Sequence, residues 1–175
     1  EDASNKFTGN DLEMVLSELA LHQVKTAIDA SSGSYKAYAG IPIWAKEVVI
    51  TYDKVSIAGT FAQLLGLRIA TGAVSSGYTS MCASVIAGTY INYTTNIVLV
   101  SAGSLASEEF SGRIVLTLLD SSDNTWACNG QLSHSSEMFN ITGVVTLTAP
   151  LTEFRIVLNG ASSFDGGKIG VTIKG

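Results

Sequence analysis

Six tyrosines and two tryptophans are the side chains of this 175-residue chain whose chemistry is best suited to binding. An aromatic ring offers a flat apolar platform to the C–H groups of a sugar, and its hydroxyl or indole N–H can hydrogen-bond sugar hydroxyls. Rings in Ser- and Gly-rich surroundings, as at residues 29–40, are expected at the surface. Packing in the core is the alternative for most of the others. The candidate glycan-contacting residues are Tyr35, Tyr38, Trp44, Tyr78 and Trp126.

Oxygen-bearing side chains gather at residues 120–124, where Asp120, Asp123 and Asn124 could supply ligands to Ca²⁺. Their spacing does not follow the ligand pattern of an EF-hand loop. Asp and Asn side chains also hydrogen-bond nearby backbone groups in turns, which explains these residues without a metal. We therefore predict a hairpin turn here, and neither a metal nor another cofactor for the chain.

His134 and Glu137 lie beside serines, which together are the side-chain types of nucleophilic catalysis. No G-x-S-x-G sequence occurs, so the serines lack the strained turn that exposes a nucleophile in many hydrolases. Glycoside hydrolysis needs two carboxylates roughly 5–10 Å apart. Glu108 and Glu109 do not supply such a pair, because adjacent strand residues point to opposite faces. We predict that the chain is not an enzyme; a site shared between neighbouring chains is the alternative.

The charge of the chain excludes one large class of partners. The formal net charge is −5, and the ten basic residues are scattered without a run. Nucleic acids and anionic membrane surfaces require clustered Lys and Arg, so we expect neither as a partner. Charged residues make up 14% of the chain, well below the roughly 25% of an average soluble domain. This composition suits β-rich extracellular or virion proteins with extensive subunit contact.

Cys82 and Cys128 are the two cysteines of the chain, and each lies in a strand-like segment. Two cysteines far apart in sequence do not make a disulfide framework. We favour two reduced thiols in the core, with a single buried disulfide as the alternative that the sequence leaves open.

From residue 47 onward the sequence reads as short strands separated by turns. We expect strands at 47–52, 64–71, 77–87, 90–100, 113–120, 125–132, 143–148, 153–159 and 168–174, with a break near residues 95–96. Residues 121–124, 159–160 and 165–167 carry turn signals. Helical segments between strands, which parallel sheets require, are absent. We therefore predict a mainly β chain that folds as a jelly-roll-like antiparallel β-sandwich.

One helix is expected, at residues 8–22, ahead of the strands. Thr8 can cap its first turn, with Asp11 as the reciprocal partner of a capping box. The apolar stripe of this helix consists of Leu12, Val15, Leu16 and Leu19. So short a helix is marginal alone in water. It therefore packs on its own domain or pairs with copies of itself as a trimeric stem. We divide the chain into a linker and stem at 1–30 and a sandwich head at 31–175.

The segment 111–174 resembles the β-sandwich modules that close bacteriophage tail-fibre and tail-spike proteins. The shared pattern is a strand ending in L-x-L-x-D, a polar hairpin followed by Thr125-Trp126, a strand L-T-x-F-R-I and a closing strand F-D-x-G-x-I-x-V. The segment KFTGNDLEMVLSEL is similar to the short helices that tie three fibre chains together below a head. Residues 31–110 match no such module, and a host-specific surface is expected there.

This resemblance implies a homotrimer at the distal tip of a fibre, from a phage of Gram-negative bacteria such as Acinetobacter. Its expected partners are the rest of the fibre and a bacterial surface receptor, either a capsular or lipopolysaccharide glycan or an outer-membrane protein. The protein would be assembled in the host cytoplasm and would act on the virion, outside the cell. The first residue is not Met, so we expect the chain to be a piece of a longer one. The alternatives are a polysaccharide-cleaving spike fragment, a purely structural trimerisation module, and a stand-alone adhesin.

Overall fold

The computed structural model describes residues 21–60, 62–100, 106 and 108–175, and within these ranges the chain forms strands, turns and bends but no helix. The described part accordingly contains no helix that is long and apolar enough to cross a membrane. The predicted stem helix, with its stripe of Leu12, Val15, Leu16 and Leu19, lies outside the described residues.

The strands are β1 (His22–Val24), β2 (Ile28–Asp29), β3 (Tyr35–Ala39), β4 (Glu47–Ile57), β5 (Gln63–Ile69), β6 (Gly72–Ala73), β7 (Tyr78–Ser84), β8 (Tyr90–Tyr93), β9 (Ile97–Val100), β10 (Phe110–Asp120), β11 (Thr125–His134), β12 (Glu137–Thr146), β13 (Glu153–Leu158) and β14 (Phe164–Lys174).

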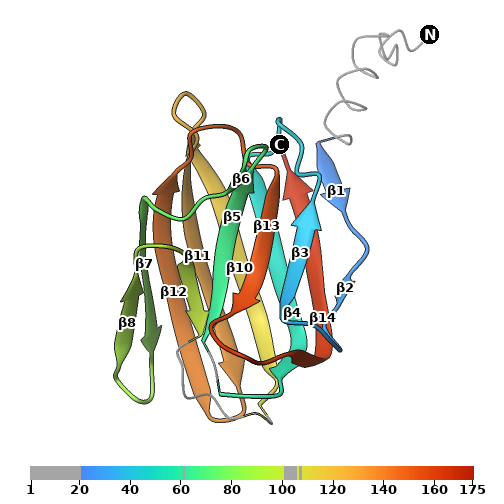
Figure 1. Cartoon of the computed structure of the whole chain (residues 1–175), viewed down its shortest axis with the longest axis vertical. Helices are drawn as coiled ribbons and strands as arrows, with labels where there is room; N and C mark the ends of the chain where they lie inside the picture. The colour runs from blue at the N-terminus through green and yellow to red at the C-terminus, as the bar shows by residue number, and fades with distance from the viewer. Residues whose placement is uncertain (1–20, 61, 101–105, 107) are drawn as a thin grey trace, which may run out of the picture.

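These strands form two antiparallel sheets that pack face to face, with the smaller sheet in front of the larger one in Figure 1. The larger sheet has nine strands in the order β1-β14-β4-β10-β11-β12-β7-β8, and β2 also pairs with β14. The smaller sheet has five strands in the order β3-β13-β5-β6, and β9 also pairs with β5. The antiparallel β-sandwich predicted from the sequence is therefore confirmed.

Alternation of apolar and polar residues along the strands builds the core between the two sheets. In β12, Phe139, Ile141 and Val145 are buried, whereas Asn140 and Thr142 between them are exposed. Successive strand residues point to opposite faces, so this pattern gives each sheet one apolar face. Phe110, Phe154 and Phe164 are among the largest fully buried side chains, and the buried residues form one continuous cluster. Removing this apolar surface from water is the main stabilising term of the fold.

The β10–β11 hairpin closes at residues 121–124, as the sequence predicts. The Asp120 carboxylate accepts a hydrogen bond from the backbone N–H of Ser122 at 2.7 Å. The Asp123 carboxylate accepts one from the N–H of Thr125 at 2.9 Å. Both acids therefore act as turn residues. No group of three or more metal-ligating side chains occurs in the described part of the chain.

The predicted break near residues 95–96 is where the chain passes from one sheet to the other. β8 ends at Tyr93 and pairs with β7 in the larger sheet, whereas β9 begins at Ile97 and pairs with β5 in the smaller sheet. The Ser80 hydroxyl fastens this crossing, because it donates to the Asn96 carbonyl at 2.9 Å and accepts from the Val98 N–H at 3.3 Å. All four residues of β9 are buried.

A β-bulge at Lys54 bends the larger sheet. β4 has one residue more than β14 and β10 at this point, and Lys54 has a φ of 53°. A bulge of this kind kinks its strand and increases the local twist. Gly167 lies opposite the bulge with a φ of +88°, and a Cβ there would be 2.3 Å from the Lys54 carbonyl oxygen. The prediction that residues 165–167 form a turn is wrong, because they lie within β14 and accommodate the bulge.

The sandwich begins earlier in the chain than the predicted boundary at residue 31. β1 and β2 both pair with β14 and so belong to the larger sheet. His22, expected as the last residue of the stem helix, is the first residue of β1. The segment 29–40, expected as a connection, contains β3, which pairs with β13. Short strands of this kind at the edges of a sheet take their conformation from pairing rather than from their own sequence.

Cys82 and Cys128 are buried and are not joined in a disulfide, which decides between the alternatives left open by the sequence. They lie on β7 and β11, and β12 runs between those strands. The Cys82 thiol donates a hydrogen bond to the Leu99 carbonyl at 3.4 Å. Burial raises the pKa of the Cys128 thiol to about 12, so this group stays protonated in the folded chain.

Candidate functional site

The outward faces of β10, β11 and β12 form a polar surface on the larger sheet. Arg113, Gln131 and Asn140 are strand-to-strand partners in the register and form one row across these three strands. Their chain neighbours Ile114 and Leu132 are fully buried, so the row itself points away from the core. A hollow of about 790 Å³ opens over this row. The row therefore places a guanidinium and two amides in one surface depression.

The next row of the same face supplies an apolar floor beside the polar groups. Val49, Val115, Asn129 and Thr142 are consecutive partners across β4, β10, β11 and β12. Val49 points outward but is only 6% exposed. The Val115 side chain thus lies next to the amide of Asn129, and the hydroxyl of Thr142 follows on the next strand. Such a mixture of apolar floor and hydrogen-bonding groups is typical of small-molecule binding sites.

A second hollow of about 530 Å³ continues this face toward β7 and β8. Its outward-pointing lining includes Met81 and Asn92, which are register partners, together with Thr142. Thr142 lies directly opposite Asn129 of the first hollow, so the two hollows adjoin. We call the combined depression the outer-face groove. Its main lining residues are Glu47, Met81, Asn92, Arg113, Val115, Asn129, Gln131, Asn140 and Thr142.

Some polar groups of the groove are paired closely with a neighbouring side chain, whereas others are not. The Gln131 side-chain amide donates to the Asn140 side-chain oxygen at 2.9 Å. This bond leaves the Gln131 oxygen and the Asn140 NH₂ group directed to solvent. The Glu47 carboxylate is 2.6 Å from the Lys174 ammonium, which adjoins the groove on β14, and 4.0 Å from the Arg113 guanidinium. The Glu47 charge is thus neutralised mainly by Lys174.

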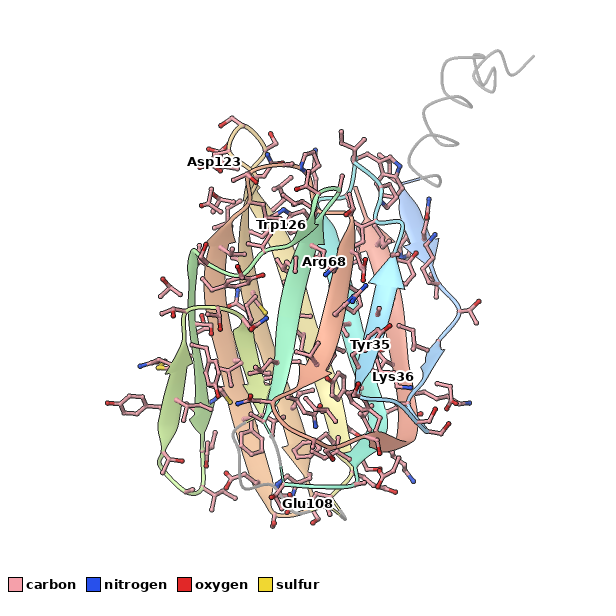
Figure 2. All side chains as sticks on the ribbon, in the orientation of Figure 1. Tyr35, Lys36, Arg68, Glu108, Asp123 and Trp126 are labelled. Atoms are coloured by element: carbon pink, nitrogen blue, oxygen red, sulfur yellow. The ribbon has the colours of Figure 1, made fainter. Side chains whose placement is uncertain are left out.

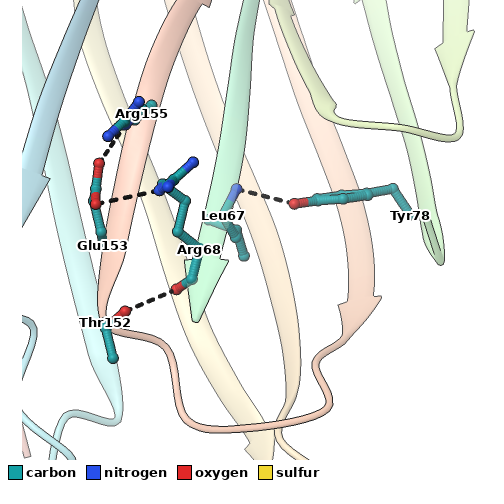
Figure 3. Close-up of polar contacts among 6 residues, drawn as sticks. All are labelled: Leu67, Arg68, Tyr78, Thr152, Glu153 and Arg155. Carbon is teal, nitrogen blue, oxygen red and sulfur yellow. Dashed lines mark hydrogen bonds and ion pairs between the residues drawn. The ribbon is translucent and has the colours of Figure 1, made fainter. Parts of the chain in front are cut away.

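The outward face of the smaller sheet carries a different cluster, which Figure 3 shows. The Glu153 carboxylate pairs with Arg155 on its own strand and with the Nε of Arg68 on β5 at 3.3 Å. The Arg155 guanidinium lies 5.0 Å from the centre of the Tyr35 ring. Each charged group of this cluster therefore has a partner within it. A ligand would have to displace these contacts. We therefore interpret the cluster as a structural link between β3, β13 and β5.

Among the five candidate aromatic residues, Tyr35 presents its ring to solvent. It is 50% exposed and is the first residue of β3; Figure 2 labels its side chain. Tyr38 points to the inner side of the smaller sheet and stacks on Phe154, with the ring centres 5.9 Å apart. Trp44 is partly buried and packs against the core. None of these three lines the outer-face groove.

Tyr78 and Trp126 belong to the core, which corrects their interpretation as glycan contacts. Each is 3% exposed, so neither ring can stack on a sugar in this structure. The Tyr78 hydroxyl accepts a hydrogen bond from the backbone N–H of Leu67 at 2.9 Å and donates to the Val74 carbonyl at 3.3 Å. Burial raises the pKa of Tyr78. A large amphipathic ring gains more from burial than from exposure when its polar end finds a partner.

His134 and Glu137, considered above for catalysis, are held in separate structural contacts. The His134 ring packs edge-on against Phe110 at 5.1 Å, and its Nδ1 is 3.3 Å from the Glu108 carboxylate. The Glu137 carboxylate accepts a hydrogen bond from the backbone N–H of Ile86 at 2.9 Å. Such bonds from backbone N–H groups favour the charged form and lower the pKa of Glu137. His134 and Glu137 are register partners across the β11–β12 hairpin, and each side chain contacts a different group.

The groove residues Arg113, Gln131 and Asn140 were not among the residues singled out from the sequence. The alternation in the predicted strand 125–132 does carry a signal, since Asn129 and Gln131 occupy its outward positions. Their alignment with Arg113 and Asn140 depends on the register between three strands, which single-strand patterns do not provide.

No protein-family model matches the chain, and no curated protein matches it. Among solved structures, a legume lectin-like domain from Entamoeba histolytica is similar over 91% of this chain and 90% of that chain, with 10% sequence identity and a TM-score of 0.32. This likeness is too weak to carry an argument about fold or function.

Proposed function

We propose that the β-sandwich is a non-enzymatic module that binds a bacterial surface glycan through the outer-face groove. The observation that carries this proposal is the row Arg113–Gln131–Asn140 beside the apolar side chain of Val115 in the same hollow. Sugars present hydroxyl groups around an apolar C–H face, so a site for them needs hydrogen-bonding groups and an apolar surface together. The groove offers both without a deep cavity.

The length of the groove suits a chain of sugars rather than a single one. It crosses the larger sheet from β10 through β11, β12 and β7 to β8. Neighbouring strands lie about 4.8 Å apart, so the four spacings span roughly 19 Å. A short oligosaccharide segment of a capsule or lipopolysaccharide can extend along such a distance. Each sugar then meets side chains from a different strand.

The arrangement of carboxylates supports binding rather than hydrolysis. Glu47 is the one carboxylate among the described residues that line the two hollows. Glycosidases of the usual kind need two carboxylates, roughly 5–10 Å apart, one of them acting as an acid. The Glu47 carboxylate is also paired with the Lys174 ammonium. We therefore keep the prediction that the chain is not an enzyme.

We further propose that the module is the receptor-binding tip of a phage tail fibre and acts as a homotrimer. The support for this setting is the likeness of segment 111–174 to fibre-tip modules and the predicted stem stripe of Leu12, Val15, Leu16 and Leu19. Shallow sites of this kind bind weakly one at a time. Linking three of them on one tip raises the overall affinity without any new contact.

A glycan array probed with the full chain tests the groove. We expect binding to bacterial surface glycans, and we expect the double variant Gln131→Ala, Asn140→Ala to weaken it. Hydrogen bonds contribute roughly 1 kcal/mol each, and about 1.4 kcal/mol is a tenfold change, so the loss should be about 10- to 50-fold. Tyr35→Ala, on the opposite face, is the matched control and should bind normally.

The opposite pattern would contradict the groove as the site. If Tyr35→Ala abolished binding and the double variant retained it, the glycan would bind on the smaller sheet. If no glycan, capsule or bacterial cell bound at all, a structural trimerisation module would explain the chain better. Light scattering on a sizing column tests the assembly, because a trimer of 18.3 kDa chains has a mass of about 55 kDa. A monomer would contradict the trimeric tip.

A further inference from the structure

Resting on the proposed function, we infer that the outer-face groove selects an anionic sugar, whose acidic group binds Arg113 beside the amides of Gln131 and Asn140. The acidic group is a carboxylate, as in uronic acids, or a sulfate or phosphate substituent. Each of these presents two or more oxygens to a guanidinium. The inference names the class of glycan and the residue that recognises it.

Arg113 is a cation without a close partner among the described side chains. Its side chain is 57% exposed, and its ion-pair contact there is to the Glu47 carboxylate at 4.0 Å. That same Glu47 oxygen lies 2.6 Å from the Lys174 ammonium. Coulomb attraction falls with distance, so Lys174 is the principal counter-ion of Glu47. The guanidinium of Arg113 thus remains available to an incoming anion.

The two arginines on the opposite face of the sandwich differ from Arg113, because both guanidinium groups have close partners. Arg68 and Arg155 share the Glu153 carboxylate, and Arg155 also packs on the Tyr35 ring. Arg113 has neither a shared carboxylate at this range nor an aromatic ring among the described residues. The chain carries a net charge of −5. A guanidinium without a close counter-ion therefore makes the groove locally positive on an acidic chain.

The groups beside Arg113 suit an acidic sugar. Arg113 pairs in register with Gln131, and Gln131 pairs with Asn140. The Asn140 oxygen accepts from Gln131, which turns the Asn140 NH₂ donors to the groove. Arginine presents a planar fork of donors that binds carboxylate and phosphate oxygens in pairs. The row therefore combines a fork for the acidic group with amide donors and acceptors for the ring hydroxyls.

Desolvation gives the physical reason for a preference over neutral sugars. A glycan that fills the groove removes water from the Arg113 guanidinium. Burying a charge without a counter-ion is costly. A neutral sugar leaves that cost in place, whereas an acidic sugar offsets it with charge-assisted hydrogen bonds. The same groove therefore favours the acidic member of any matched pair of glycans.

The test compares acidic polysaccharides with their carboxyl-reduced forms, which are neutral but otherwise identical. The probes are hyaluronan, alginate and polygalacturonate with their reduced counterparts, a sulfated glycan, and the capsules that the array identifies. We expect the wild-type chain to bind the best acidic probe roughly 10- to 100-fold more tightly than its neutral counterpart. Arg113→Gln should remove this preference and Arg113→Lys should retain part of it. Arg155→Gln, on the opposite face, is the control.

Each outcome decides the question. Loss of the acid preference in Arg113→Gln, with binding of the neutral form unchanged or tighter and a normal Tm, supports the inference. Preference for sulfated over carboxylated probes would identify the acidic group and still support it. A best ligand that is neutral, or an acid preference that survives Arg113→Gln, overturns the inference while the proposed function stands. Absence of binding to any glycan overturns both.

Discussion

The Tyr78 hydroxyl joins the two sheets, and Tyr78→Phe tests how much that bond stabilises the fold. Tyr78 is on β7 of the larger sheet, and it accepts the N–H of Leu67 on β5 of the smaller sheet at 2.9 Å. Along this edge of β5, β9 pairs only at residues 63–65 and β6 only at residues 68–69. The phenol therefore fills a gap in the ladder where no strand reaches the Leu67 N–H (Figure 3).

The magnitude follows from what the substitution leaves behind. Phenylalanine keeps the buried ring and removes the hydroxyl, so the Leu67 N–H loses its partner while it stays buried. Leaving a buried donor unsatisfied costs about 1–3 kcal/mol. The second contact, to the Val74 carbonyl at 3.3 Å, is longer and adds little. In a chain of this size about 1 kcal/mol shifts the Tm by roughly 2–4 °C, so a loss of about 2 kcal/mol lowers it by about 4–8 °C.

Thermal and urea unfolding of the full chain measure this effect, with Tyr35→Phe as the control. Tyr35 is half exposed, and its hydroxyl has no bond to protein in the described contacts, so this control should unfold within about 0.5 kcal/mol of the wild type. Equal stability of Tyr78→Phe and the wild type would refute the assigned role of the hydroxyl. Loss of glycan binding at unchanged stability would instead return Tyr78 to the list of glycan contacts.

Two glycines with positive φ and the two buried cysteines give further predictions. Gly167→Ala should destabilise the fold by more than about 2 kcal/mol, because its φ is +88° and the new Cβ meets the Lys54 carbonyl. Gly40→Ala, with a similar φ of +78° and open space around it, should cost only about 1 kcal/mol by chemical denaturation. A thiol reagent should leave Cys82 and Cys128 unmodified in the folded chain and modify both after unfolding; rapid reaction of the native chain would contradict their burial. The raised pKa of Cys128 means that the folded thiol keeps its proton while the unfolded thiol ionises near its ordinary value of 9.0, so stability should fall as the pH rises above about 9.

The strands that the sequence predicted are those whose alternation reflects burial on one face. The expected strand 125–132 appears as Thr125–His134, and 153–159 appears as Glu153–Leu158. Both place apolar residues at every second position, which the core requires. By contrast, β1 and β2 are two or three residues long, and their partner β14 alone makes them strands. No local pattern marks such segments.

A glycine-rich segment can mark either a turn or a β-bulge, and the sequence alone did not distinguish the two at residues 165–167. Residues 165–167 carry the composition of a turn, yet they run through β14 opposite the Lys54 bulge. The requirement at Gly167 is the same in both cases, namely a positive φ and space for a neighbouring carbonyl. Whether that requirement belongs to a turn or to a bulge depends on the partner strand. The sequence of one strand does not contain that information.

The residues of the outer-face groove were not singled out for a related reason, and two of the aromatic candidates belong to the core. Tyr78 and Trp126 are rich in apolar surface, so the core competes for them and takes them. The groove is built instead from single polar residues, one on each of three strands, at Arg113, Gln131 and Asn140. A shift of one residue in either pairing would turn one member of this row into the core. The row can therefore be predicted only when the register between the strands is known. Burial of the intervening apolar residues determines that register. The core that buries Tyr78 and Trp126 therefore also aligns the polar groups of the groove.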